Sequence, residues 1–461
     1  MQFIDTHTHL QMADFENDRE EVMERAREAG VTEMIVAATG LADAPDVLAL
    51  AGSFQNIHAA VGIHPHETAG PAIKDVPAIR SLAEHPSVVA IGEIGLDYFY
   101  DFSEPANQMP VLQRQLEIAC EIGLPVITHM REAEDDLIKS IEPFKDDLAG
   151  GVLHCYTGTR ETAELFLGWG FHISFGGIVT FRKGEDIREV ASAIPVERML
   201  LETDCPYLAP APMRGKRCEP AYVVHVAEKL AELKGLSLED IARITTFNAR
   251  KLFSINTLEP GGKQGAIAYP IRDSLYLNIT NRCTNECTFC VRNARYDVKG
   301  HDLLLSREPT IDEVMAALPV DMTDYCEVVF CGLGEPTMRF DDLKEIARRL
   351  KAMGMRTRLN TNGHGDIINE RPIAQEMVGL IDEVCVSINT ASAVEYNSLC
   401  RPQFGESTYE RTLGFIRSAQ KHIGDVTLTA VASPGIDIEA CRTLAQSLGV
   451  KFRRREYNEL G

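Results

Sequence analysis

The sequence predicts a two-domain α/β protein, in which an eight-stranded α/β barrel is followed by a second βα series of six strands. Three observations support this prediction. The 461 residues exceed what one hydrophobic core usually supports, since single barrels run to about 250 residues. Short β-branched runs alternate with longer amphipathic stretches, which is typical of βα units around a parallel sheet. A polar segment rich in Gly interrupts the series near residue 260.

The first βα series extends to about Phe253. Eight parallel strands with intervening helices indicate a TIM-type (β/α)8 barrel, whose catalytic groups are expected at the carboxyl ends of the strands. The predicted strands are Gln2–Asp5, Glu33–Ala37, Ile57–Val61, Val88–Gly92, Pro125–Thr128, Gly151–His154, His172–Ser174 and Met199–Glu202.

The segment Glu259-Pro-Gly-Gly-Lys-Gln-Gly265 is interpreted as a linker, because it is short, polar and rich in residues that break helices and strands. We therefore predict domains over residues 1–258 and 271–461, joined by a linker over residues 259–270. The second βα series shows no tandem repeat. Its predicted strands are Leu275–Ile279, Glu327–Phe330, Thr357–Leu359, Glu383–Ser387, Val426–Ala430 and Lys451–Arg454.

Composition and charge narrow the classes of function. With 45% hydrophobic and 25% charged residues, the chain has the composition of an ordinary globular protein. No basic segment with an apolar run opens the sequence, and no stretch approaches the roughly 18 apolar residues of a membrane span, so we expect a cytoplasmic protein with no membrane partner. Twelve Cys in a chain of this length do not indicate a disulfide framework. Residues 1–258 carry 22 basic and 40 acidic side chains, which disfavours a broad grip on nucleic acid through many phosphates.

Six possible metal ligands fall at the ends of five predicted strands. His7 and His9 point to the same side, because side chains along a strand alternate between its two faces. Two imidazoles on one face at the mouth of a barrel make half of a metal site. A single His is more often a hydrogen-bonded core residue, but six such groups at strand ends are hard to explain as packing. The other four are Glu93, His129, His154 and Asp204.

These residues lie in motifs that resemble the TatD family of metal-dependent deoxyribonucleases, within the amidohydrolase-like barrels. The resemblance covers about residues 1–255 and holds for the order and the spacing of its segments. It implies two divalent metal ions that activate water and orient a phosphodiester. Mixed imidazole and carboxylate ligands suit Zn²⁺, Mn²⁺ or Mg²⁺. The segments are DTHTH, VGIHPH, IGEIGLDY, HCYTG and LLETDCPYLAP.

The resemblance also implies how the ligands are divided between the two ions. Glu93 would bridge both ions. The first ion would bind His7, His9 and Asp204 in addition, and the second would bind His129 and His154.

Further catalytic roles follow from the same resemblance. Asp204 would also accept the proton of the attacking water. Glu202, on the same strand face, has either a direct role or supports a His, and His64 either contacts substrate phosphate or shapes its loop. The family's basic loop appears as Arg214-Gly-Lys-Arg-Cys218, with Cys218 where the pattern usually has Asn. Its cations either meet phosphates or form solvated surface.

The segment Cys283-Thr-Asn-Glu-Cys287-Thr-Phe-Cys290 follows the first strand of the second series. Three thiolates at this spacing can hold three irons of a [4Fe–4S] cluster and leave the fourth open, whereas structural zinc normally requires four closed ligands. With Phe289 before the last Cys, the segment resembles the CxxxCxΦC motif of the radical S-adenosylmethionine (radical SAM) superfamily. The resemblance implies a partial (βα)6 barrel, SAM on the open iron, and a low-potential electron donor such as flavodoxin or ferredoxin.

About forty residues later, Phe330-Cys-Gly-Leu-Gly-Glu-Pro-Thr337 resembles the glycine-rich strand end with which this superfamily binds the amino group of SAM. Gly332 and Gly334 would let the backbone approach the ligand, and Glu335 would offset its positive charge. Polar side chains at the next two strand ends suit the ribose hydroxyls or the carboxylate of SAM, although each is as often a turn or cap residue. They are Asn360, Asn362, Ser387 and Asn389.

The leading hypothesis is a bifunctional enzyme. A phosphodiester hydrolase that acts on nucleic acid or a nucleotide would be joined to a radical SAM enzyme that cleaves SAM to a 5′-deoxyadenosyl radical and acts on an unknown substrate. The whole chain resembles a TatD protein fused to a TatD-linked radical SAM protein, including the ending Arg455-Glu-Tyr-Asn-Glu. Three alternatives stay open: an ester hydrolase such as an aminoacyl-tRNA deacylase, an RNA-base modifier as the radical half, and a radical half that is a non-catalytic redox-sensing module.

Overall fold

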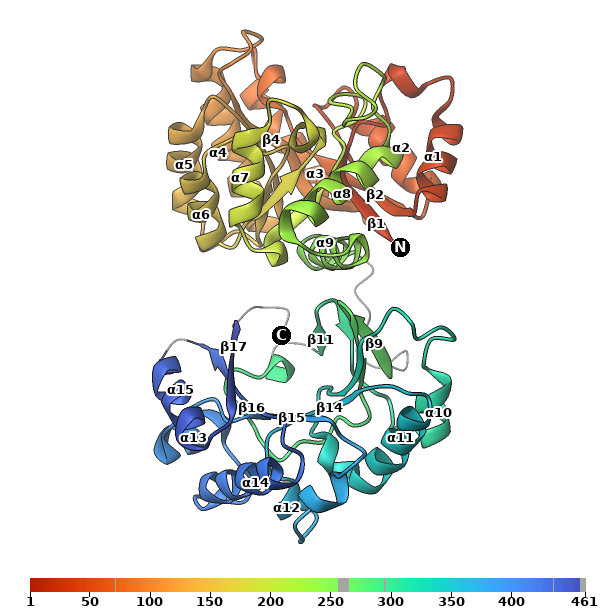
Figure 1. The fold of residues 1–461 in the computed structure, drawn as a ribbon. Coiled ribbons are helices and arrows are strands. Elements are labelled where there is room, and N and C mark those ends of the chain that lie inside the picture. Colours follow the sequence, from red (N-terminus) through yellow and green to blue (C-terminus); the bar gives the residue numbers. More distant parts are fainter. Residues whose placement is uncertain (71, 256–264, 294–295, 434, 457–461) are drawn as a thin grey trace. The chain divides into compact units, whose positions relative to one another are not determined.

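The computed structural model describes residues 1–70, 72–255, 265–293, 296–433 and 435–456. The chain divides into two compact units, Met1–Leu258 and Glu259–Gly461, and each unit has its own sheet of parallel or mainly parallel strands (Figure 1). The first residues of the predicted linker lie outside the described residues. The end of the chain after Glu456 also lies outside them. Residues 268–270 of that linker belong instead to a strand of the second unit, β9 (Ala268–Ile271), in which Tyr269 is buried with Leu303 and Leu333.

The first unit is an eight-stranded barrel whose strands pair in chain order, all of them parallel. The first and last strands meet through a bridge between Thr8 and Cys205 and a hydrogen bond of 3.0 Å from Thr6 Oγ1 to the Leu201 carbonyl. The predicted barrel is therefore confirmed. Its strands are β1 (Phe3–Thr8), β2 (Val31–Ala37), β3 (Ile57–Val61), β4 (Val88–Asp97), β5 (Val126–Arg131), β6 (Gly151–Leu153), β7 (His172–Phe175) and β8 (Met199–Leu201).

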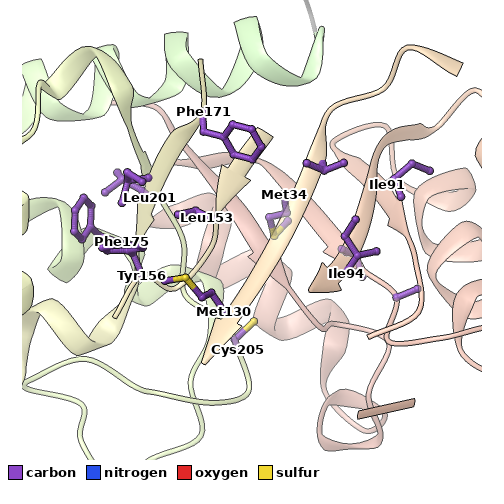
Figure 2. Close-up of a cluster of buried hydrophobic side chains, with 14 of the residues drawn as sticks. Met34, Ile91, Ile94, Met130, Leu153, Tyr156, Phe171, Phe175, Leu201 and Cys205 are labelled. Carbon is purple, nitrogen blue, oxygen red and sulfur yellow. The ribbon is translucent and has the colours of Figure 1, made fainter. Parts of the chain in front are cut away.

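Successive apolar side chains along each strand point to opposite faces of this sheet and pack on both of them. One buried cluster lies between strands and helices, and Figure 2 shows part of it, including Met34, Leu153 and Leu201. The helices around the barrel are α1 (Arg19–Glu28), α2 (Ala44–Ser53), α3 (Val76–Ala83), α4 (Pro105–Ile122), α5 (Glu134–Ile141), α6 (Arg160–Gly168), α7 (Glu185–Ala193), α8 (Val223–Lys234) and α9 (Leu238–Phe253).

A second cluster fills the inside of the barrel and is closed by α9. Ile35 and Leu200, each next in sequence to a residue of the first cluster, pack with Phe253 of this helix. Thr246 Oγ1 donates to the Gln2 carbonyl just before β1. Because α9 covers the end where the strands start, only the opposite end, at the strand carboxyl termini, is left for a site.

The second unit is an open sheet in the order β17-β16-β15-β14-β13-β10-β9. The six predicted strands are present and parallel, and β9 pairs antiparallel at the edge beside β10. Sequence reasoning missed β9 because it contains Pro270 and its turn, Arg272-Asp273, lacks glycine, although an edge strand tolerates proline. The parallel strands are β10 (Ser274–Leu277), β13 (Glu327–Phe330), β14 (Thr357–Thr361), β15 (Glu383–Ser387), β16 (Val426–Ala432) and β17 (Lys451–Glu456).

One face of this sheet is apolar and carries the helices, with Leu277, Phe330 and Leu359 in the core. The other face is polar: Arg358 pairs with Glu327 at 2.7 Å. Among the described residues, no helix is long and apolar enough to cross a membrane. The remaining elements are a small hairpin, β11 (Asp297–Val298) and β12 (His301–Asp302), and the helices α10 (Ile311–Ala316), α11 (Phe340–Ala352), α12 (Gly365–Ile368), α13 (Ala393–Cys400), α14 (Thr408–His422) and α15 (Ile438–Ser447).

Candidate active sites

The predicted metal ligands converge at the carboxyl ends of the barrel strands, around Glu93 of β4. Glu93 Oε2 lies 3.2 Å from His7 Nε2 and 3.7 Å from His9 Nε2. These two imidazole nitrogens are 3.2 Å apart. Asp204 Oδ1 completes the group at 3.5 Å from His9 Nε2. The ligand atoms of His7, His9 and Asp204 all lie within 4.8 Å of one another, a spacing that one cation can bridge.

The other carboxylate oxygen of Glu93 faces a second set of imidazoles. Glu93 Oε1 lies 2.7 Å from His154 Nε2 and 2.8 Å from His129 Nδ1. His64 Nε2 lies 3.3 Å from the same oxygen, and His64, Glu93 and His129 form a further group with ligand spacing. Thus His64, for which sequence reasoning gave only a phosphate contact or a loop-shaping role, points its ring nitrogen at the shared carboxylate.

The donor set fits two divalent cations. His7, Glu93 and His154 are buried, and facing nitrogen lone pairs in a buried site are costly without a cation between them. Burial by itself raises the pKa of Glu93, but the surrounding imidazoles hold this pKa well below its ordinary value. His9 Nδ1 lies 3.0 Å from the Ala37 carbonyl, which fixes the tautomer that leaves Nε2 free to bind metal.

Asp97, at the end of β4, positions one of these imidazoles, and sequence reasoning gave it no role. Its Oδ2 accepts hydrogen bonds of 2.9 Å from Nε2 of both His129 and His66. Burial by itself raises the pKa of Asp97, but these hydrogen bonds hold it well below its usual range. The signal was available, since Asp97 lies four residues after Glu93 and side chains along a strand repeat every two residues.

Glu202 lies behind His154 instead of facing the cluster centre. Its Oε1 accepts from the backbone N–H of Cys155 at 2.5 Å and lies 3.4 Å from His154 Nδ1. Glu202 Oε2 is buried without a hydrogen-bond partner among the described residues. Of the two roles considered for Glu202, this geometry favours support of His154.

The basic loop after β8 is largely engaged by the protein itself. Arg217 pairs with Asp18 at 2.6 Å, and the Arg214 guanidinium lies 3.8 Å above the centre of the Phe181 ring. Cys218, at the position where the family pattern usually has Asn, is buried and donates through Sγ to the Thr203 carbonyl at 3.8 Å. These contacts anchor the loop and leave fewer cations for phosphate than the sequence suggests.

In the second unit, the three predicted cluster ligands share the loop after β10. Cys283, Cys287 and Cys290 are half-buried and free of disulfides. The backbone N–H of Glu286 donates to the Cys400 carbonyl at 3.0 Å, and that of Thr288 donates to the Leu399 carbonyl at 2.9 Å. Three thiols on one anchored loop fit the ligand set of a cluster with one open iron.

Two buried residues, His364 and Asn362, form hydrogen bonds to Thr284 of this loop. His364 Nδ1 lies 2.8 Å from Thr284 Oγ1, and its Nε2 lies 2.8 Å from the hydroxyl of Tyr396. Asn362 Nδ2 donates to Thr284 Oγ1 at 2.9 Å and lies 3.9 Å from Cys283 Sγ. Sequence reasoning missed the role of His364 because its partners come from distant segments.

The glycine-rich segment after β13 packs tightly on the protein itself. A Cβ at Gly332 would collide with the Asn278 side chain, and one at Gly334 would collide with the backbone of residues 280 and 282. Both oxygens of Glu335 accept hydrogen bonds, one from the Asn362 backbone at 2.7 Å and the other from Thr361 Oγ1 at 2.8 Å. This segment therefore holds the ends of β13 and β14 together, and its contact with SAM stays a prediction.

The other predicted SAM contacts are divided between two environments. Asn389 Nδ2 lies 3.8 Å from Cys400 Sγ, next to the cysteine loop, and Phe289 packs on the apolar core from within that loop. Asn360 Oδ1 instead lies 3.4 Å from the Arg358 guanidinium, and Ser387 Oγ lies 3.2 Å from Thr429 Oγ1. Only Asn362 and Asn389 of the four polar residues are therefore adjacent to the cysteine loop.

A (β/α)8 barrel whose imidazoles and carboxylates converge at the strand carboxyl ends defines a metal-dependent hydrolase. Residues 4–254 match the model of the TatD related DNase family, and the chain belongs to this family. Residues 277–448 match the model of the radical SAM superfamily. One chain thus joins a TatD DNase domain to a radical SAM domain.

The matching relatives span the first unit. The uncharacterized metal-dependent hydrolase YabD of Bacillus subtilis is 42% identical over 252 residues, which are 55% of this chain and 99% of that protein. The 3′-5′ ssDNA/RNA exonuclease TatD of Erwinia amylovora is 38% identical over 257 residues, 54% of this chain and 99% of its own length. The crystal structure of YJJV, a TatD homolog from Escherichia coli K12, is 34% identical with a TM-score of 0.52 and covers 55% of this chain and 98% of its own.

Proposed function

We propose that the first unit hydrolyses phosphodiester bonds of nucleic acid with the help of two divalent ions. The observation that carries this proposal is the placement of Glu93, whose two oxygens face two different groups of ligand atoms. When bound, such ions would activate water and stabilise the leaving oxygen. The 3′-5′ exonuclease activity on single-stranded DNA and RNA in the name of the Erwinia relative supports the choice of bond.

The side chains of this unit have separate tasks in the proposed reaction. His7 and His9 would hold one ion beside Asp204, and His129 and His154 would hold the other. Asp204 reaches the same position from the end of β8, where its carboxylate can accept the proton of the attacking water. Asp97 keeps the Nδ1 lone pair of His129 directed at the centre by accepting the proton of Nε2.

The proposal is tested with the full chain supplied separately with Zn²⁺, Mn²⁺ and Mg²⁺. We expect hydrolysis of a single-stranded oligonucleotide and its loss in Glu93→Gln, because this variant removes the charge shared by both groups. An aminoacylated RNA is assayed in parallel. Deacylation of this RNA without any cleavage of oligonucleotides would overturn the proposal in favour of an ester hydrolase.

We propose that the second unit binds a [4Fe–4S] cluster through Cys283, Cys287 and Cys290 and uses it to cleave SAM. The half-buried, anchored cysteine loop supports this proposal. When reduced by a low-potential donor such as flavodoxin or ferredoxin, the cluster would supply the electron for cleavage of SAM to the 5′-deoxyadenosyl radical. Such a donor and three cysteines outside disulfides suit the reducing cytoplasm.

The radical proposal is tested by anaerobic reconstitution with iron and sulfide, followed by reductant and SAM. We expect 5′-deoxyadenosine in the wild type and none in Cys283→Ser. A reconstituted and reducible cluster that forms no 5′-deoxyadenosine would instead assign this unit a redox-sensing role. Addition of an RNA or metabolite extract then identifies the species whose mass changes.

A further inference from the structure

Three exposed aromatic rings stand at the mouth of the barrel, on the loop that follows β4. Phe99, Tyr100 and Phe102, called here the aromatic patch, are 49%, 46% and 62% exposed. The ring centres of Phe99 and Tyr100 are 4.8 Å apart, and those of Tyr100 and Phe102 are 5.7 Å apart. Contiguous aromatic surface of this kind marks an interaction site more often than isolated exposed apolar residues do.

The aromatic patch is attached to the hydrolytic centre by Asp97. Asp97 Oδ1 accepts the backbone N–H groups of Phe99 and Tyr100 at 2.9 and 3.0 Å, while its Oδ2 holds His129 and His66. The His66 ring centre lies 4.7 Å from that of Phe102. A group stacked on the aromatic patch would therefore be adjacent to the site where the phosphodiester is expected to bind.

A cation lies against the same rings. Arg131, two residues after His129 on β5, places its guanidinium 4.4 Å from the centre of the Phe99 ring and 5.9 Å from that of Tyr100. Its Nε is buried without a hydrogen-bond partner, and its side chain makes no hydrogen bond or ion pair with the described residues. A buried donor in this state fits an anionic ligand group.

The groove next to Arg131 is unfavourable for a nucleic-acid strand because its walls are acidic. This groove has a volume of about 1450 Å³ and is lined by more acidic than basic side chains, among them Glu132, Glu134 and Asp136. Acidic walls repel a phosphate backbone. Substrate contacts are therefore expected at Arg131 and the aromatic patch and not along this groove.

We propose that the aromatic patch and Arg131 form a nucleotide subsite beside the hydrolytic centre. The rings stack on an unpaired base of the substrate, and Arg131 binds a phosphate next to the one that is cleaved. Stacking on protein rings accepts any base but requires that its face is free, which selects single-stranded over double-stranded nucleic acid. This inference rests on the proposed phosphodiesterase function.

The test compares two oligonucleotides of equal length, one of thymidine nucleotides and one in which the terminal bases are replaced by abasic sites. The full chain is assayed with the divalent ion that supports hydrolysis. The variants are Tyr100→Leu combined with Phe102→Leu, which keeps an apolar surface but removes the rings, Phe102→Trp, which keeps a ring, and Arg131→Gln. Leu165→Ala, an exposed apolar residue of α6, is the control and is expected to behave as the wild type.

We expect the double leucine variant to raise KM for the base-bearing strand about tenfold more than KM for the abasic strand, the effect of losing one stacked base. Phe102→Trp should keep the wild-type ratio of the two KM values. Arg131→Gln should raise both KM values together, since it removes a phosphate contact.

Two results would overturn the inference and are distinguishable. Hydrolysis of both strands with a KM ratio that the leucine variant leaves unchanged rejects the subsite and keeps the phosphodiesterase function. Failure of the wild type to hydrolyse either strand rejects that function, and the subsite with it.

Discussion

Substitution of Asp97 by Asn is expected to weaken metal binding although Asp97 belongs to neither group of metal ligands. Asp97 Oδ2 accepts protons from Nε2 of His129 and of His66, and Oδ1 accepts two backbone N–H groups. Asn has the same shape but only one acceptor oxygen. If that oxygen stays with the backbone, the amide NH₂ faces two imidazole nitrogens that carry protons.

The consequence for His129 follows from its two ring nitrogens. With its proton on Nε2, the ring directs the Nδ1 lone pair at the centre, 2.8 Å from Glu93 Oε1. Facing an NH₂ group, the ring would move its proton to Nδ1 or leave a buried donor unpaired. A hydrogen bond to a charged group contributes about 1.5–3 kcal/mol, which corresponds to roughly a 10- to 100-fold loss of metal affinity.

The affinity is measured by competition with a chelator of known strength and, separately, by the metal concentration that gives half-maximal hydrolysis. His66→Gln is the matched control, because it removes the other proton donor of Asp97 and leaves the bond from His129. We expect this control to bind metal within about threefold of the wild type, since His66 is not among the predicted ligands. Wild-type affinity in Asp97→Asn, or an equal loss in His66→Gln, would refute the tautomer argument.

Three further predictions concern both units. Glu93→Gln should lose both ions, since each oxygen serves one group of ligand atoms, and metal analysis after dialysis should find less than one ion per chain. Cys287→Ser should lose the visible absorption of the reconstituted cluster and the formation of 5′-deoxyadenosine, with unchanged hydrolysis by the first unit. Burial and, as the smaller cause, the charge of Arg411 together lower the pKa of His364 to about 4. The stability that its neutral ring contributes is thus complete above pH about 6.5 and is lost as the pH falls toward 4. The free energy of unfolding should fall by about 3 kcal/mol over this range. Denaturant unfolding should show this decrease in the wild type and not in His364→Gln.

The sequence predicted the barrel and the convergence of its candidate metal ligands, because both follow from the period of a strand. A side chain at the end of a parallel strand must point into the mouth or away from it, so two imidazoles at His7 and His9 could be placed without coordinates. The extent of the strands was harder to predict. The strand predicted over Val88–Gly92 runs to Asp97, because Gly92 and Gly95 are not breaks. A Cβ at Gly95 would collide with the His129 backbone, so the glycine allows β4 and β5 to approach closely.

The residues that sequence reasoning missed have partners from other strands or loops. Asp97 acts on His129 of the next strand, and His364 supports a loop that precedes it by about 80 residues. Neither of these two contacts can be predicted from a periodic pattern or from the spacing of residues within one segment. The partner of a hydrogen bond depends on tertiary structure, whereas the direction of a strand side chain depends only on its position in the strand.

The same distinction applies to the glycine-rich segment of the second unit, whose contact with SAM stays a prediction. A glycine that permits a close approach does not reveal what approaches, and at Gly332 and Gly334 the neighbours are the chain's own residues. Glu335, which follows β13, likewise accepts with both oxygens from donors at the end of β14. Since Asn362, which Glu335 holds through its backbone, reaches to 3.9 Å from Cys283 Sγ, this carboxylate acts on the cysteine loop through the protein. Glu335→Gln should therefore disturb the cluster even without SAM, and a cluster spectrum identical to that of the wild type would show instead that Glu335 serves only the ligand.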